Sequence, residues 1–160
     1  MFCEHCGDVD GDETGVDHDE RDCPWYGIDD NPVIVDAAEL ADILAANADG
    51  SPALRAAIGL LARHGLWIKR LAERPRLLLI DYSGPVPQPY GIDWRKVAQA
   101  MESKQLPASG GELSILALAA SLADTAAPLR LGDAVSGLDA ANLDLVLQAV
   151  ATANGRTLTR

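Results

Sequence analysis

All three cysteines of the chain lie within its first 23 residues, in a pattern that could bind a metal ion. Cys3 and Cys6 form a Cys-x2-Cys pair, and His18 and Cys23 follow as a His-x4-Cys pair. Three thiolates and one imidazole are a common tetrahedral ligand set for structural zinc, and the Cys-x2-Cys turn lets two sulfurs face one ion. We therefore predict one structural Zn2+ bound by Cys3, Cys6, His18 and Cys23.

Other interpretations of this segment remain open. The cysteines could be incidental thiols, and His5 could replace His18 as the fourth ligand. Alternating aspartates resemble a calcium loop, but Glu13 occupies the position where such a loop needs glycine for its sharp turn. With four good protein ligands the predicted zinc site is closed, which favours a scaffold over a catalytic centre.

Charge divides the chain sharply. Residues 1–50 contain fifteen acidic residues and one arginine, whereas residues 51–160 contain nine acidic and twelve basic residues, for a net charge of -11. The acidic segment is either a solvated loop or a surface that attracts a basic partner. The predicted partner-binding residues are Asp8, Asp10, Asp12, Asp17 and Asp19.

Six basic residues fall in one short stretch that could contact a phosphate backbone. They are Arg55, Arg63, Lys69, Arg70, Arg74 and Arg76. A nucleic acid would have to tolerate the acidic segment next to them, so we favour an internal role, in which they face the protein's own acidic residues. Nucleic-acid binding stays the alternative function.

Hydrophobic periodicity predicts a mainly α-helical protein. Asp36, Ser51, Asp93, Ser109 and Asp139 are each placed to begin a helix. The predicted helices are 37–47, 52–71 with a break near Gly65, 94–104, 113–123 and 140–154, with a turn or short helix at 129–137. In the last long helix we expect Leu143, Val146, Leu147 and Val150 to face the core. The alanines of helix 113–123 should let neighbouring helices approach closely. The expected fold is a small helical bundle with an N-terminal zinc-stapled loop module.

The stretch between these helices is harder to interpret. Residues 76–82 are too few for a confident helix, and a strand there would need a partner. Three prolines and Gly84 make 83–91 an extended linker. The predicted organisation is a zinc-binding acidic module at 1–30, a helical segment at 31–82, the linker at 83–91 and a helical bundle at 92–160.

Two blocks in the C-terminal part carry a resemblance. Ser109-Gly110-Gly111-Glu112, then Asp133 and Ser136-Gly137-Leu138-Asp139, resemble the signature motif, Walker B position and D-loop of ABC-type ATPases. The resemblance implies contact with a γ-phosphate, but Ala134 stands where that family has a water-positioning acid. The sequence has no Gly-rich phosphate loop with Lys and Ser or Thr, so it cannot hydrolyse ATP by itself. The same residues also fit a helix start and a turn into an N-cap.

The same region also resembles a group of small, uncharacterised proteins of actinobacteria and their phages. The matching residues are Leu106-Pro107-Ala108-Ser109-Gly110 and Gly137-Leu138-Asp139-Ala140-Ala141-Asn142, within a third of the chain. This resemblance implies a phage or mobile-element origin and no particular reaction.

These features together predict a non-enzymatic zinc-binding protein that acts through protein–protein interaction, for example in host interaction or regulation by a phage. The expected partner is a protein with a basic surface, and we expect no membrane association and a cytoplasmic location. A third hypothesis is an enzyme that uses Asp133 or Asp139 as acid or base, although each aspartate is also a good helix-capping residue.

Overall fold

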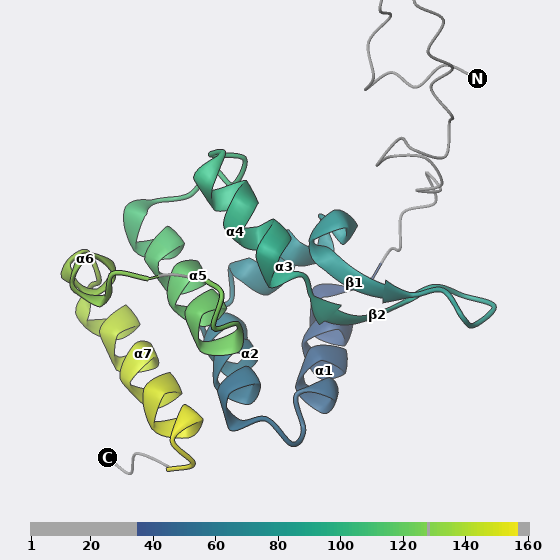
Figure 1. The fold of residues 1–160 in the computed structure, drawn as a ribbon, viewed down its shortest axis with the longest axis horizontal. Coiled ribbons are helices and arrows are strands. Elements are labelled where there is room, and N and C mark those ends of the chain that lie inside the picture. The colour runs from purple at the N-terminus through teal and green to yellow at the C-terminus, as the bar shows by residue number, and fades with distance from the viewer. Residues whose placement is uncertain (1–34, 128, 157–160) are drawn as a thin grey trace, which may run out of the picture. The chain divides into compact units, whose positions relative to one another are not determined.

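The computed structural model describes residues 35–127 and 129–156, which belong to one compact unit, Val33–Arg160 (Figure 1). This part of the chain is mainly α-helical, as predicted, and contains one two-stranded sheet. The elements are α1 Ala37–Asn47, α2 Pro52–His64, α3 Trp67–Ala72, the short 3-10 helix η2 Pro75–Leu77, β1 Leu78–Asp81, β2 Gln88–Ile92, α4 Trp94–Glu102, α5 Gly110–Ala123, α6 Leu131–Ser136 and α7 Ala140–Ala153.

The predicted helix starts are confirmed by hydrogen bonds. In each case a side-chain oxygen accepts a backbone N–H from the first turn, which satisfies a group that the helix itself leaves unpaired. The capping residues are Asp36, Ser51, Asp93, Ser109 and Asp139. Because these signals are local in sequence, the helices begin directly after their capping residues. The predicted range 113–123 is too short, since α5 begins at Gly110, next to its cap Ser109.

Helix α2 lies at the centre of the unit. It packs against α5 and α7 on one side and against α1 and α3 on the other (Figure 1). Its residues Ile58, Leu60 and Leu61 are buried. The predicted break near Gly65 is present, since Gly65 adopts φ +80° at the C-cap of α2 and α3 begins at Trp67.

The prediction of a linker at 83–91 is wrong. Residues 88–92 form β2, which pairs antiparallel with β1 and so supplies the partner that residues 76–82 were thought to lack. Pro89 lies opposite Ile80, directly after a register shift between Leu79 and Ile80. A two-stranded sheet tolerates proline because each strand has one edge that needs no N–H donor. The hairpin therefore belongs to the same compact unit as the helices on both sides of it.

The predicted core face of the last helix is also largely wrong. Val146 is buried, but Leu143, Leu147 and Val150 are 39%, 50% and 51% exposed. The residues of α7 that are buried are Val146 and Ala149. A helix with apolar residues on two faces buries the face that meets its neighbours, and periodicity alone does not identify that face.

Within the described ranges, no helix is both long enough and apolar enough to cross a lipid bilayer.

Candidate protein-docking groove

An open groove of about 480 Å³ lies between α4, α5, α6 and the loop that precedes α6. Its lining is mostly apolar, with the larger side chains of Met101, Leu113 and Leu129 and a set of small ones. The small residues are Ala98, Ala117, Ala120, Ala127 and Ala134. Concave apolar surfaces of this size commonly receive apolar groups of a ligand or a partner protein.

Polar side chains also line the groove. Glu102, Arg130 and Asp133 are exposed, and Ser114 is half-buried. Two carboxylates against one guanidinium make the groove weakly acidic. Asp133, one of the two predicted acid or base candidates, is therefore at the groove, whereas Asp139 caps α7 by accepting the Asn142 N–H at 2.8 Å.

The alanines of α5 explain why the groove is open. They were expected to let helices approach closely, and Ala119 and Ala120 are indeed buried. Ala117 is only partly buried and lines the groove. The run of alanines that helps to form the groove was therefore visible in the sequence. The sequence did not show which of them a neighbouring helix covers.

The sequence blocks 109–112 and 136–139 lie next to each other. A Cβ placed on Gly111 would come 3.5 Å from the carbonyl oxygen of Gly137. Ser109 and Glu112 form a capping box at the start of α5: the Ser109 N–H donates to Glu112 Oε2 at 2.7 Å, and the Glu112 N–H donates to Ser109 Oγ at 3.3 Å. The helix-start interpretation of Ser-Gly-Gly-Glu is thus confirmed.

The capping box also changes the acidity of the Glu112 side chain. Hydrogen bonds from the Ser109 backbone and side chain lower the pKa of Glu112, with smaller contributions from the charges of Arg70 and His64. Because these bonds are made to the ionised form, the capping box is strongest when Glu112 is deprotonated.

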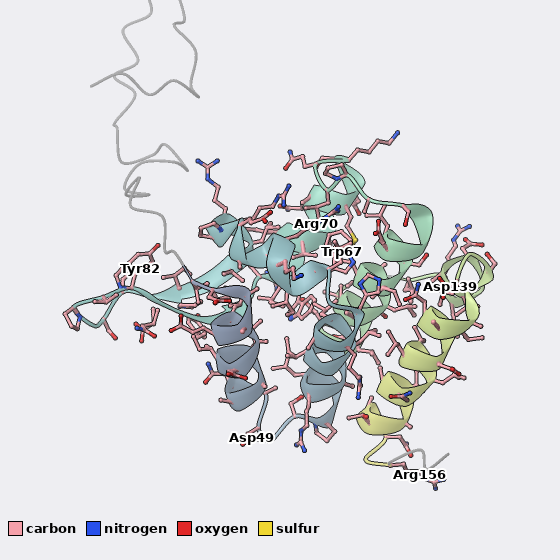
Figure 2. The ribbon with its side chains drawn as sticks, turned by 180° about the vertical axis from the view of Figure 1, so that it is seen from behind. Asp49, Trp67, Arg70, Tyr82, Asp139 and Arg156 are labelled. Atoms are coloured by element: carbon pink, nitrogen blue, oxygen red, sulfur yellow. The ribbon has the colours of Figure 1, made fainter. Side chains whose placement is uncertain are left out.

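Trp67 joins α3 to the start of α5 (Figure 2). It is almost fully buried, and its indole N–H donates to the Glu112 carbonyl at 2.8 Å. The guanidinium of Arg70 stacks 5.3 Å from the centre of the Trp67 ring and donates to the Pro107 carbonyl. Both contacts of Arg70 are made within the chain, so its side chain helps to hold α3 against the segment before α5.

The other predicted nucleic-acid contacts are spread over several elements. Arg55, Arg63 and Lys69 are exposed on α2 and α3, Arg76 is exposed in η2, and Arg74 is half-buried. Arg74 donates to the Arg70 carbonyl at 3.3 Å, and the end of Arg63 lies against Gly59. Arg70 and Arg74 therefore contact backbone carbonyls and the Trp67 ring within the chain. The predicted pairing of this cluster with the acidic N-terminal segment lies outside the described residues.

The remaining predicted site residues lie outside the described residues. These are the zinc ligands Cys3, Cys6, His18 and Cys23 and the acidic residues Asp8, Asp10, Asp12, Asp17 and Asp19. Between residues 35 and 156, leaving out residue 128, no cluster of three or more His, Cys, Asp or Glu side chains is arranged to hold a metal ion. The zinc site stays a prediction from the donor set.

A second apolar patch lies on the hairpin. Tyr82, Val86 and Tyr90 are 66%, 61% and 48% exposed, on the element that projects from the helices at the end opposite α7 (Figures 1 and 2). We call these three residues the hairpin patch. Exposed tyrosines on a projecting element are typical of protein contact surfaces.

Comparison of the chain with protein-family models, with curated proteins and with solved structures finds no match in any of the three. What the groove binds therefore has to follow from its own chemistry.

Proposed function

We propose that this protein is a non-enzymatic, zinc-binding protein that acts by binding another protein with a basic surface. The observation that carries the proposal is the groove between α4, α5 and α6, which combines an apolar lining with the exposed carboxylates of Glu102 and Asp133. The acidic residues Asp8, Asp10, Asp12, Asp17 and Asp19 would attract such a partner over longer distances.

The chemistry of the groove supports a polypeptide ligand. It is open to solvent, and five of its twelve lining residues are alanines, which leaves room for side chains of a partner. A helix with an apolar face and flanking lysines would place aliphatic groups over Ala117 and Ala134 and ammonium groups near Glu102 and Asp133. This is the helix-in-groove mode of recognition.

The test uses the full-length protein and two synthetic amphipathic helices with the same apolar face, one with lysines and one with glutamates on the polar face. In NMR titrations we expect the lysine peptide to shift the amide signals of Ala98, Ala117 and Ala134. Its affinity should fall as salt rises from about 0.05 to about 0.5 M, because salt screens the attraction. The glutamate peptide should bind at least about tenfold more weakly.

A groove-filling variant locates the contact. Ala117→Phe should weaken binding of the lysine peptide by about tenfold or more, since the new ring takes the place of the partner's side chains. Ala46→Phe makes the same change at an exposed position of α1, outside the groove, and should leave binding unchanged. Equal affinity of the two peptides, or no effect of Ala117→Phe, would contradict the proposal.

A DNA-binding measurement on the same full-length protein tests the alternative function. If a DNA duplex binds the protein, and if neutralising Arg55 and Lys69 to Gln abolishes that binding, nucleic acid becomes the favoured partner instead. We expect no such binding at physiological salt, because the net charge of -11 repels phosphates.

A further inference from the structure

Helix α7 lies at the edge of the unit and leaves one apolar face exposed (Figure 1). Its buried residues, Val146 and Ala149, belong to the side that packs against α2 and α5. On the other side, four apolar residues that follow one another along the helix remain exposed. We call them the α7 seam: Ala140, Leu143, Leu147 and Val150.

The spacing of the α7 seam is that of a coiled coil. Its residues are separated by three, four and three positions. This repeat keeps side chains on one side of a helix, where they insert between the side chains of a facing helix. α7 has 14 residues, which correspond to two heptads and a length of about 21 Å. The seam therefore suits a helix of similar length better than a small ligand.

Aspartates occupy the positions that flank the seam. If Ala140 is heptad position a, Asp139 is the g position before it and Asp144 is the following e position. Residues at e and g border a coiled-coil contact, and their charges select the partner helix. The Asp139 carboxylate accepts hydrogen bonds from the backbone N–H and the side-chain amide of Asn142, at 2.8 and 3.1 Å. Both donors are uncharged, so these bonds do not neutralise the negative charge.

This charge pattern selects a basic partner. From Leu131 to Gly155 the chain contains three aspartates and no Lys or Arg. A second copy would bring identical aspartates to the same border, and a nucleic acid or an anionic lipid surface would bring phosphates, so each of these is repelled. A helix with Lys or Arg at its own e and g positions would instead form ion pairs along the border.

We propose that the α7 seam is a second docking surface, which binds a basic amphipathic helix of a partner protein. The apolar side chains of that helix pack between Leu143, Leu147 and Val150, and its cations lie beside Asp139 and Asp144. This inference goes beyond the groove contact, because none of the residues that line the groove belongs to α7. Each surface can bind a helix without the other.

The experiment is an NMR titration of the full-length protein with two synthetic heptad peptides that share leucines at a and d. One carries lysines and the other glutamates at e and g, each at a concentration where the peptide alone is monomeric. We expect the lysine peptide to shift the amide signals of Leu143, Leu147 and Val150, in the wild type and in the groove-filling variant Ala117→Phe alike. The glutamate peptide should bind the seam at least about tenfold more weakly.

Three variants test the seam and its border, with folding checked by circular dichroism. Leu147→Gln should weaken binding of the lysine peptide at least about tenfold, because it removes the apolar side chain in the centre of the seam. Val86→Gln makes the same kind of change in the hairpin patch and should leave the affinity unchanged. Asp144→Lys reverses the charge at one border and should reduce the preference for the lysine peptide over the glutamate peptide.

Equal affinity of the two peptides for the seam would overturn the proposal, and so would a Leu147→Gln variant that binds like the wild type. If the α7 signals move with protein concentration in the absence of peptide, the occupant is a second copy and the proposal is wrong. Shifts confined to the groove residues Ala98, Ala117 and Ala134 would also contradict it while supporting the groove. Shifts confined to α7 would contradict the groove contact alone.

Discussion

Glu112 illustrates how one residue is used twice at a helix start. Its carboxylate completes the capping box with Ser109, and its backbone carbonyl accepts the indole N–H of Trp67. The side-chain role was predictable, since Ser-x-x-Glu before an apolar run is a capping signature. The contact with Trp67 was not predictable, because the two residues are 45 positions apart.

The lowered pKa of Glu112 leads to a prediction about acid stability. Because the pKa in the folded state lies below the unfolded value of 4.5, ionised Glu112 stabilises the fold above that value, and this contribution is lost as pH falls through the folded pKa. Glu112→Gln keeps an acceptor for the Ser109 N–H but cannot ionise. Urea unfolding between about pH 6 and about pH 2.5 should thus show a shallower loss of stability for Glu112→Gln than for the wild type. Identical pH profiles would contradict this.

At the scale of elements, one glycine within α2 and one directly after it have opposite effects on stability. Gly65 ends α2 with a φ of +80°, a backbone conformation that residues with a Cβ rarely adopt. Gly59 lies in the middle of the same helix, where the end of the flexible Arg63 side chain is the closest neighbour of an added Cβ, at 3.3 Å. Glycine is required at position 65 because of its positive φ, whereas at position 59 it only lowers the helix propensity of α2.

We therefore expect opposite effects from the same substitution. Gly65→Ala should lower the free energy of unfolding by about 1 kcal/mol, because it forces alanine into a left-handed conformation. Gly59→Ala should raise it by about 0.5–1 kcal/mol through better helix propensity, once Arg63 has moved aside. Urea denaturation of both variants beside the wild type measures this. Changes of the same sign would show that the difference in backbone conformation does not control stability here.

At the scale of the whole molecule, the predicted zinc site can be tested by counting bound metal. If Cys3, Cys6, His18 and Cys23 bind Zn2+, native mass spectrometry of protein purified without added metal should show one zinc per chain, lost on acid denaturation. Cys6→Ser and Cys23→Ser should release it and leave the helical circular dichroism signal in place. Full zinc occupancy in both variants would exclude this ligand set.

Histidine variants decide between the ligand alternatives that the sequence leaves open. His18→Ser should release the metal, whereas His5→Ser should retain it. His64→Asn serves as the control, since His64 ends α2 within the described unit and is not part of the predicted ligand set. Release by His5→Ser alone would move the fourth ligand to His5.

The sequence by itself determined the features that depend on neighbouring residues. The helix starts at Asp36, Ser51, Asp93, Ser109 and Asp139, the end of α2 at Gly65 and the mainly α-helical character all follow from caps, propensity and periodicity. The zinc site also rests on local signals, the ligand types and their spacing, but it lies outside the described residues and stays a prediction.

Only the tertiary structure decided which surfaces are covered. It paired 88–92 with 78–81, although prolines suggested a linker, and it turned Leu143, Leu147 and Val150 of α7 outward. It also left the groove over Ala117 open. The physical reason is the same in each case: burial depends on which elements pack together, and an apolar residue carries no local signal of the neighbour that will cover it.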